Sequence, residues 1–117
     1  MILSLMAQYQ PLDGLFLALS DPTRRAVIGR LSRGPATVTE LAAPFEMALP
    51  SFLKHIHQLE ESGWIATEKL GRVRTCRLEP ATFAAAQSWL DEQRALWEGR
   101  TDRLAAFVTR PNKENAP

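Results

Sequence analysis

The sequence predicts a mainly α-helical domain that carries one small β-hairpin. Apolar residues recur with helical spacing through the first half of the chain, change to alternation after Gly63, and return to helical spacing from Pro80. A length of 117 residues fits a single domain. We therefore assign residues 12–108 to one folded domain, residues 1–11 to an N-terminal tail and residues 109–117 to a flexible C-terminal tail.

The first two helices are marked by apolar spacing and by end signals. The first helix has apolar residues at positions i, i+3, i+4 and i+7: Leu12, Leu15, Phe16 and Leu19. In the second helix, Asp21 is suited to the N-cap and Pro22 to the first helical position, and Gly34 with Pro35 ends the element.

A short third helix precedes a longer fourth helix. The run "TVTELAAPF" opens with a capping box formed by Thr37 and Glu40, and Pro44 ends it. The fourth helix runs from about residue 49 to residue 62 and places its apolar residues on one side: Leu49, Phe52, Leu53, Ile56 and Leu59. Its polar residues gather roughly opposite: Ser51, Lys54, His55 and Gln58.

The second half of the chain predicts a hairpin and a long helix. The runs "WIATEK" and "VRTCRL" alternate and flank Leu70, Gly71 and Arg72, which is typical of a β-hairpin. From Pro80 the helical spacing continues to about residue 108, with an apolar residue at every seventh position: Phe83, Leu90, Trp97 and Leu104. Two short helices, a basic hairpin and a long helix, in this order, predict a winged helix-turn-helix fold.

Basic charge gathers in the middle of the chain, although the formal net charge is only +1. The segment 20–78 contains nine Lys and Arg against six Asp and Glu, a balance of +3, and the segment 69–77 contains four basic residues and no acid. Such a concentration favours a polyanionic partner. We therefore predict that the fourth helix enters the major groove of double-stranded DNA and that the hairpin contacts the neighbouring backbone.

The predicted DNA contacts divide between the helix and the hairpin. Gln58 is suited to an adenine edge and Lys54 to guanine or a phosphate, and Ser51 and His55 share their face. In the hairpin we assign Arg72 and Arg74 to DNA, and we expect Lys69 and Arg77 to be solvated, because alternate strand residues point to opposite faces. A solvated surface helix would show the same polar stripe as residues 49–62. We favour DNA binding because a capped helix precedes this helix and a basic hairpin follows it.

The long last helix also predicts a homodimer. A 28-residue amphipathic helix is longer than so small a domain needs, so we expect its surplus to pack on a second copy beside the first helix. The tail 1–11 is expected to pack at this interface. The predicted interface residues are Leu12, Leu15, Phe16, Phe83, Trp89, Leu90, Trp97 and Leu104.

Other function classes find little support in the sequence. Phosphate-loop, nucleophile-elbow and HExxH motifs are all absent, which argues against an enzyme, and no cofactor is indicated. His55 and His57 point in different directions on one helix, so we expect no metal site. Cys76 is the single cysteine, and we expect a packed thiol. No apolar run reaches the length of a membrane span, and we expect a cytoplasmic protein without membrane contact.

The segments "LSDPTRR", "TVTELA", "KHIHQLEESG" and "GRVR" together resemble the ArsR family of winged-helix repressors, over roughly residues 12–108. The closest likeness is to the metal-independent branch encoded beside SRPBCC-fold proteins. The resemblance implies a homodimer joined through its first and last helices, and repression at a pseudo-palindromic operator. It assigns Ser51, Lys54, His55 and Gln58 to the recognition helix and Arg72 and Arg74 to the wing.

The chain departs from the family pattern at several positions. Metal sensors of the family place a cysteine pair where this chain has Ala42 and Pro44, and others use histidine in the last helix, whereas no histidine follows His57. Relatives commonly read "SxPAVSKHL" in the recognition helix, and this chain lacks the hydroxyls at Ala48 and Leu53. Two alternatives remain: a winged-helix protein-interaction module, and a repressor gated by a small ligand or by oxidation of Cys76.

Overall fold

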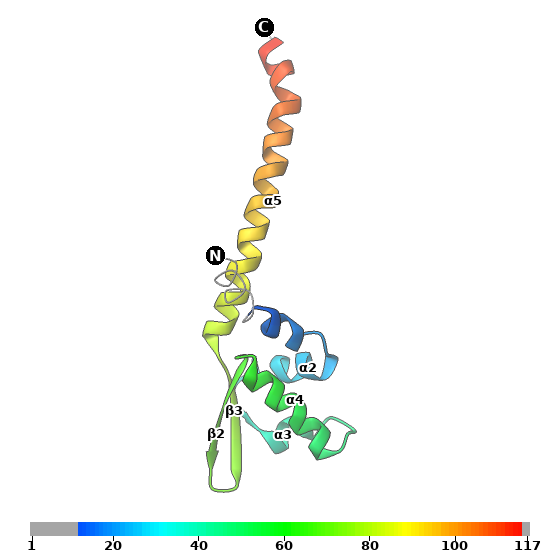
Figure 1. The fold of residues 1–117 in the computed structure, drawn as a ribbon, viewed down its shortest axis with the longest axis vertical. Helices are drawn as coiled ribbons and strands as arrows, with labels where there is room; N and C mark the ends of the chain where they lie inside the picture. The colour runs from blue at the N-terminus through cyan, green and yellow to red at the C-terminus, as the bar shows by residue number, and fades with distance from the viewer. Residues whose placement is uncertain (1–11, 116–117) are drawn as a thin grey trace, which may run out of the picture. The chain divides into compact units, whose positions relative to one another are not determined.

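The computed structural model describes residues 12–115, so the N-terminal tail 1–11 lies outside the described residues. The chain divides into two compact units between Ala86 and Gln87, within the last helix. In the first unit, residues 12–18 form a helical segment. The following elements are α2 (Pro22–Leu31), β1 (Ala36–Thr37), α3 (Val38–Ala42), α4 (Leu49–Glu61), β2 (Ile65–Leu70), β3 (Val73–Leu78) and α5 (Pro80–Asn115) (Figure 1).

The helix ends follow the local signals in the sequence. The Asp21 side chain accepts a hydrogen bond from the Arg24 backbone N–H at 3.1 Å and so caps α2. Both halves of the predicted capping box are formed at α3, where the Thr37 hydroxyl and the Glu40 carboxylate each accept a bond from the other residue's N–H, at 3.1 Å. The N-cap of α4 is Ala48, which offers no side-chain hydrogen bond. The missing hydroxyl at position 48 therefore leaves α4 without a side-chain cap.

The sheet has three strands instead of the two that the sequence predicts. Strand β3 lies between β1 and β2, and both pairings are antiparallel. In the short strand β1, Ala36 pairs with Cys76 and Thr37 pairs with Thr75. Because β1 has only two residues, it shows no alternation that a sequence pattern could reveal. The predicted hairpin is confirmed, and Gly71 takes a positive φ of 64° in its two-residue loop.

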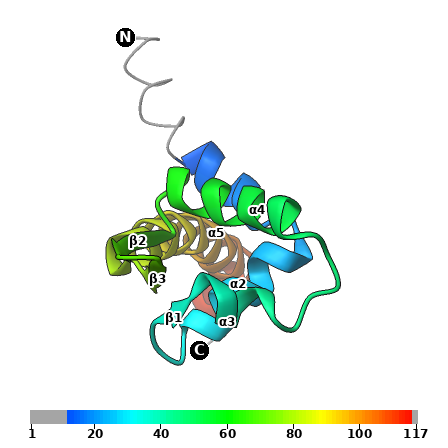
Figure 2. The same cartoon turned by 90° about the horizontal axis from the view of Figure 1, so that it is seen from below.

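The core of the first unit is formed by side chains from every element. Helices α2, α3 and α4 pack around it next to the sheet (Figure 2). Phe52, Ile56 and Leu59 are the buried residues of α4. The indole Nε1 of Trp64 donates to the backbone oxygen of Leu15 at 2.8 Å, which satisfies the one polar atom of a buried ring.

Three predicted positions differ from the structure. Leu15 was assigned to the dimer interface, but it is 4% exposed and belongs to the core of a single chain. Leu49 and Leu53 share the predicted apolar side of α4 with the core residues, but their side chains are 56% and 41% exposed. The hydrophobic stripe of α4 is wider than the surface that its own chain covers, which a periodic pattern alone cannot show.

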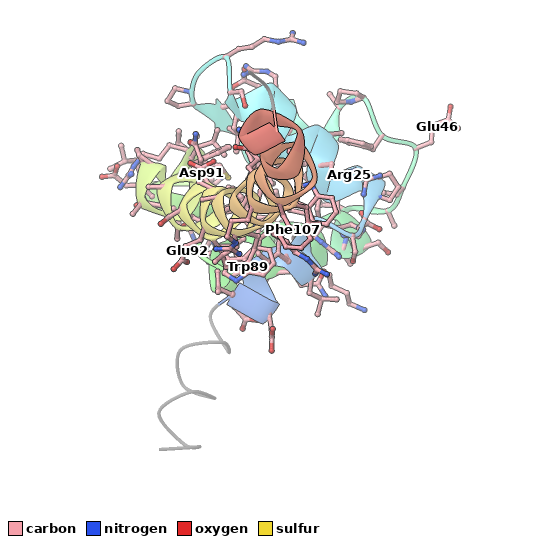
Figure 3. The ribbon with its side chains drawn as sticks, turned by 90° about the horizontal axis from the view of Figure 1, so that it is seen from above. Arg25, Glu46, Trp89, Asp91, Glu92 and Phe107 are labelled. Carbon is pink, nitrogen blue, oxygen red and sulfur yellow. The ribbon has the colours of Figure 1, made fainter. Side chains whose placement is uncertain are left out.

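The second unit consists of the part of α5 that follows Ala86. The helix ends at Asn115, beyond the boundary near residue 108 that the sequence predicts. Helix propagation needs only backbone hydrogen bonds, so a polar composition does not by itself end a helix. Seen along the axis, Trp89 and Phe107 lie on the same side of α5 and Asp91 lies on another side (Figure 3). Large apolar side chains remain exposed along this part of the helix: Leu90, Leu96, Trp97, Leu104 and Phe107.

Candidate nucleic-acid interface

The exposed side of α4 is defined by its three buried residues. At about 100° per residue, the direction opposite Phe52, Ile56 and Leu59 is occupied by Lys54 with its neighbours at one-turn spacing. Ser51, Lys54 and Gln58 are all exposed, as a surface that meets a partner requires. Lys54 and Glu61 are thus the residues of α4 that point most directly away from the core.

The flank of α4 that faces α2 is organised by Arg24. The Nη1 atom of Arg24 donates to Gln58 Oε1 at 2.5 Å and lies 3.2 Å from His55 Nδ1. Asp21 Oδ2 lies 3.6 Å from the same histidine nitrogen. The His55 side chain is only 21% exposed, so it contacts its own chain more than solvent. The two predicted contacts His55 and Gln58 are therefore held by α2, a link across more than thirty residues that sequence spacing does not show.

Arg24 also fixes the end of the first helical segment. Its Nε donates to the backbone oxygen of Ala18 at 2.7 Å, and its Nη2 donates to that of Leu17 at 3.3 Å. Burial raises the pKa of Asp21, but the hydrogen bond from the Arg24 N–H and the electrostatic interactions with His55 and Arg24 leave the pKa below its ordinary value. One guanidinium therefore joins residues 12–18, α2 and α4, and the neighbouring carboxylate stays ionised.

The other flank of α4 borders a groove of about 730 Å³ between α4, the start of α3 and the hairpin. The hairpin loop and the N-terminal half of α4 lie at the same end of the unit (Figure 1). From α4 the groove is lined by Leu49, Leu53 and His57 among others. From the hairpin it is lined by Lys69, Arg72, Val73 and Arg74. This groove brings the predicted wing residues next to the recognition helix.

The hairpin cations lie in two places. Lys69 and Arg74 are directly opposite each other in the β2–β3 register, so their side chains share one face of the sheet. Lys69 therefore lines the groove with Arg72 and Arg74, and it is exposed to solvent there, as the sequence predicts. Arg77 lies elsewhere and pairs with Glu79 through an Nη1–Oε1 contact of 2.7 Å.

Three cations line this groove, and Lys54 lies beside it on α4. Lys54, Lys69, Arg72 and Arg74 are exposed, and none of them forms a salt bridge with a carboxylate of the described residues. Glu60 also lines the groove, and its carboxylate accepts a hydrogen bond from the Thr67 hydroxyl. The four free cations can therefore bind phosphates without first breaking an ion pair.

Cys76 lies in the core under the sheet and is fully buried, which confirms the prediction of a packed thiol. Burial raises the pKa of its thiol, Glu60 raises it further, and the Arg74 charge offsets part of the effect. The thiol is thus neutral and shielded from oxidants at physiological pH.

The described residues contain no group of three or more His, Cys, Asp or Glu side chains that could hold a metal ion. Within the same part of the chain, no helix combines the length and the apolar character that crossing a bilayer requires.

Comparison with known proteins agrees with this geometry. Residues 19–68, which contain α2, α3, α4 and most of β2, match a family described as a helix-turn-helix domain. Over 86 residues the chain is 34% identical to the HTH-type transcriptional regulator Rv2034 of Mycobacterium tuberculosis, a match that covers 74% of this chain and 80% of the relative. It is also 27% identical over 79 residues to the transcriptional repressor SdpR of Bacillus subtilis, covering 68% of this chain and 88% of that protein.

A solved structure extends the likeness to three dimensions. The crystal structure of an ArsR family transcriptional regulator superposes with a TM-score of 0.74 at 68% sequence identity, over 76% of this chain and 92% of the other. The chain belongs to the ArsR family of transcriptional regulators. In this ArsR-family member, α3 and α4 form the helix-turn-helix, and β2 with β3 forms the wing. Homologues of this kind are transcriptional regulators and not enzymes, and the helix-turn-helix assigns the chain to the DNA-binding proteins.

Proposed function

We propose that this ArsR-family protein is a repressor that binds a pseudo-palindromic operator as a homodimer and does so without sensing a metal. The observation that carries the proposal is the groove lined by unpaired cations between α4 and the wing. The repressor assignment is supported by the B. subtilis relative, whose name describes that protein as a transcriptional repressor.

In the proposed complex, α4 enters the major groove and the wing lies along the adjacent backbone. Lys54 and Ser51 meet base edges or phosphates from the exposed side of α4, and Arg72 and Arg74, now joined by Lys69, bind phosphates. Gln58 has its Oε1 occupied by Arg24, so its free amide N–H groups favour an acceptor on DNA over the two-bond adenine contact that the sequence suggests. His55 acts mainly as a support for this flank.

The proposed dimer uses the apolar side of α5. Leu90, Leu96, Trp97, Leu104 and Phe107 are each about half exposed or more. At about 100° per residue, these five residues lie on one side of α5. Figure 3 shows Trp89 on the same side as Phe107, so Trp89 belongs to this stripe. A helix with such a stripe is stabilised when a second helix covers it. Leu12, Phe16 and Phe83 remain candidates for the same interface, and Phe83 already packs edge-on against Trp64 at 5.0 Å.

The absence of metal sensing is supported by the residues that stand where metal-sensing members of the family carry their metal ligands. The places of the cysteine pair hold Ala42 and Pro44, neither of which has a metal-binding side chain. Cys76 is buried with a raised pKa, so it is poorly suited to serve as an oxidation sensor.

The proposal is tested by selecting bound duplexes from a random DNA library and measuring the mass of the complex by light scattering. We expect a two-fold-symmetric motif occupied by two chains. The Lys54→Ala variant should lose preference for that motif, whereas Arg77→Ala, a matched cation outside the groove, should retain it. Enrichment of no motif, or a complex of one chain on an asymmetric site, would contradict the proposal.

A further inference from the structure

Two leucines of the recognition helix are exposed without a structural reason. Leu49 is 56% and Leu53 41% exposed, and they lie one turn apart in the N-terminal half of α4. Both line the groove between α4 and the wing. The core of the unit is closed by Phe52, Ile56 and Leu59, so these two leucines are not needed to fill it.

The surroundings of the two leucines identify the kind of partner that can cover them. Lys54 follows Leu53 directly, and Lys69, Arg72 and Arg74 lie on the opposite wall of the groove. An apolar peptide in this groove would remove these charges from water without supplying anions. Duplex DNA supplies phosphates for the cations, and the only apolar group on its major-groove base edges is the C5-methyl group of a pyrimidine.

Apart from Ser51, the side chains of residues 48–53 also lack the groups that read bases by hydrogen bonding. Ala48, Leu49 and Leu53 carry no donor or acceptor, so they cannot form the bonds by which a hydroxyl or amide selects a base. A leucine facing a base edge discriminates by apolar contact, which favours a methylated pyrimidine over an unmethylated one.

We propose that Leu49 and Leu53 form an apolar reader of pyrimidine C5-methyl groups, so that the operator contains thymine or 5-methylcytosine under the N-terminal half of α4. This inference rests on the proposed binding of α4 in the major groove. It adds the chemical group that the helix selects, which is the C5-methyl group. Thymine differs from uracil, and 5-methylcytosine from cytosine, by this one group.

The test replaces single thymines of the selected operator by deoxyuridine, which removes the methyl group and leaves every hydrogen-bonding group unchanged. Fluorescence anisotropy at constant salt should show one or two positions per half-site at which the Kd rises by about fourfold, the effect of withdrawing one methyl-sized group from an apolar contact. Replacing both symmetric copies should raise the Kd by about fifteenfold if the half-sites act independently. Where the reader meets a cytosine, 5-methylcytosine should bind more tightly than cytosine by the same factor.

The protein side of the test uses Leu53→Ala and Leu49→Ala. The affected variant should bind thymine and deoxyuridine duplexes equally, so the ratio of the two Kd values falls to about one. Leu17→Ala is the matched control, because Leu17 is 68% exposed and does not line the groove, and its ratio should stay at the wild-type value.

Two results separate this inference from the proposed function. If the wild-type protein binds its operator and Lys54→Ala impairs binding, but no thymine position responds to deoxyuridine, the reader is refuted and the repressor proposal stands. If no duplex is bound at all, both are refuted. A wild-type methyl effect that persists in both leucine variants would also overturn the assignment, because another side chain would then be the reader.

Discussion

Arg24 joins the recognition helix to α2 and to residues 12–18, and replacing it with lysine tests that role. Lysine retains the positive charge but lacks the planar fork that lets arginine donate in several directions. In the native chain, Arg24 forms two short hydrogen bonds, of 2.7 Å to the Ala18 backbone oxygen and 2.5 Å to Gln58 Oε1. The contacts at 3.3 Å to Leu17 and 3.2 Å to His55 are longer and contribute less.

The expected cost follows from these bonds. A net contribution of about 0.5–1.5 kcal/mol for each hydrogen bond gives about 1–3 kcal/mol for the two short ones. Lysine can keep one of them, so we expect Arg24→Lys to lower the free energy of unfolding by about 0.5–1.5 kcal/mol. At roughly 4–8 °C per kcal/mol for a domain of about 100 residues, this corresponds to a fall in Tm of roughly 2–12 °C.

The assay is urea unfolding followed by tryptophan fluorescence, since Trp64 lies in the core. Arg25→Lys is the matched control, because Arg25 is exposed and donates one hydrogen bond, to the Leu19 backbone oxygen at 2.8 Å. Its effect should stay within about 0.5 kcal/mol. A double-mutant cycle with Gln58→Ala should give a coupling of about 0.5–1.5 kcal/mol. Equal stability of the two lysine variants, or a coupling of zero, would refute the role given to Arg24.

Three further predictions concern the wing, the thiol and α5. Arg72→Ala should weaken binding to all duplexes alike and reduce the slope of log K against log salt by about 0.9 per subunit, whereas Arg77→Ala should leave the slope unchanged. If Arg72→Ala and the native protein show equal slopes in titrations from low to moderate salt, the wing does not contact the phosphates. Cys76 should react with a thiol reagent only as fast as the chain opens, and rapid labelling of native protein would contradict its burial. Because the folded pKa of Cys76 is raised, its contribution to stability should be constant below the ordinary value of 9.0 and should fall as pH rises above that value. Leu104→Glu should convert the proposed dimer to a monomer, which light scattering measures as a halved mass. Because Leu104 is 56% exposed within one chain, the helix content of the monomer in circular dichroism should not fall. An unchanged mass would exclude Leu104 from the interface.

The sequence by itself determined the elements and their order. Asp21 with Pro22, and Thr37 with Glu40, mark helix starts by interactions within one turn, so reading them requires no knowledge of the fold. The alternation in residues 65–70 and 73–78 likewise determined the hairpin, because the two strands are neighbours in the chain. The order of these local elements was enough to indicate the winged helix-turn-helix.

Only the tertiary structure decided which side of each element is covered. Strand β1 exists because Ala36 and Thr37 pair with Cys76 and Thr75. Arg24 likewise holds Gln58, which is more than thirty residues away in the chain. Neither contact produces a periodic pattern in the sequence. Leu49 and Leu53 share the apolar stripe of α4, but the packed core stops short of them and leaves them in the groove beside the wing. Helical periodicity determines the direction in which a side chain points around the helix axis. The exposure of that side chain depends on how far the neighbouring elements extend over it, and this is decided only when the elements pack together.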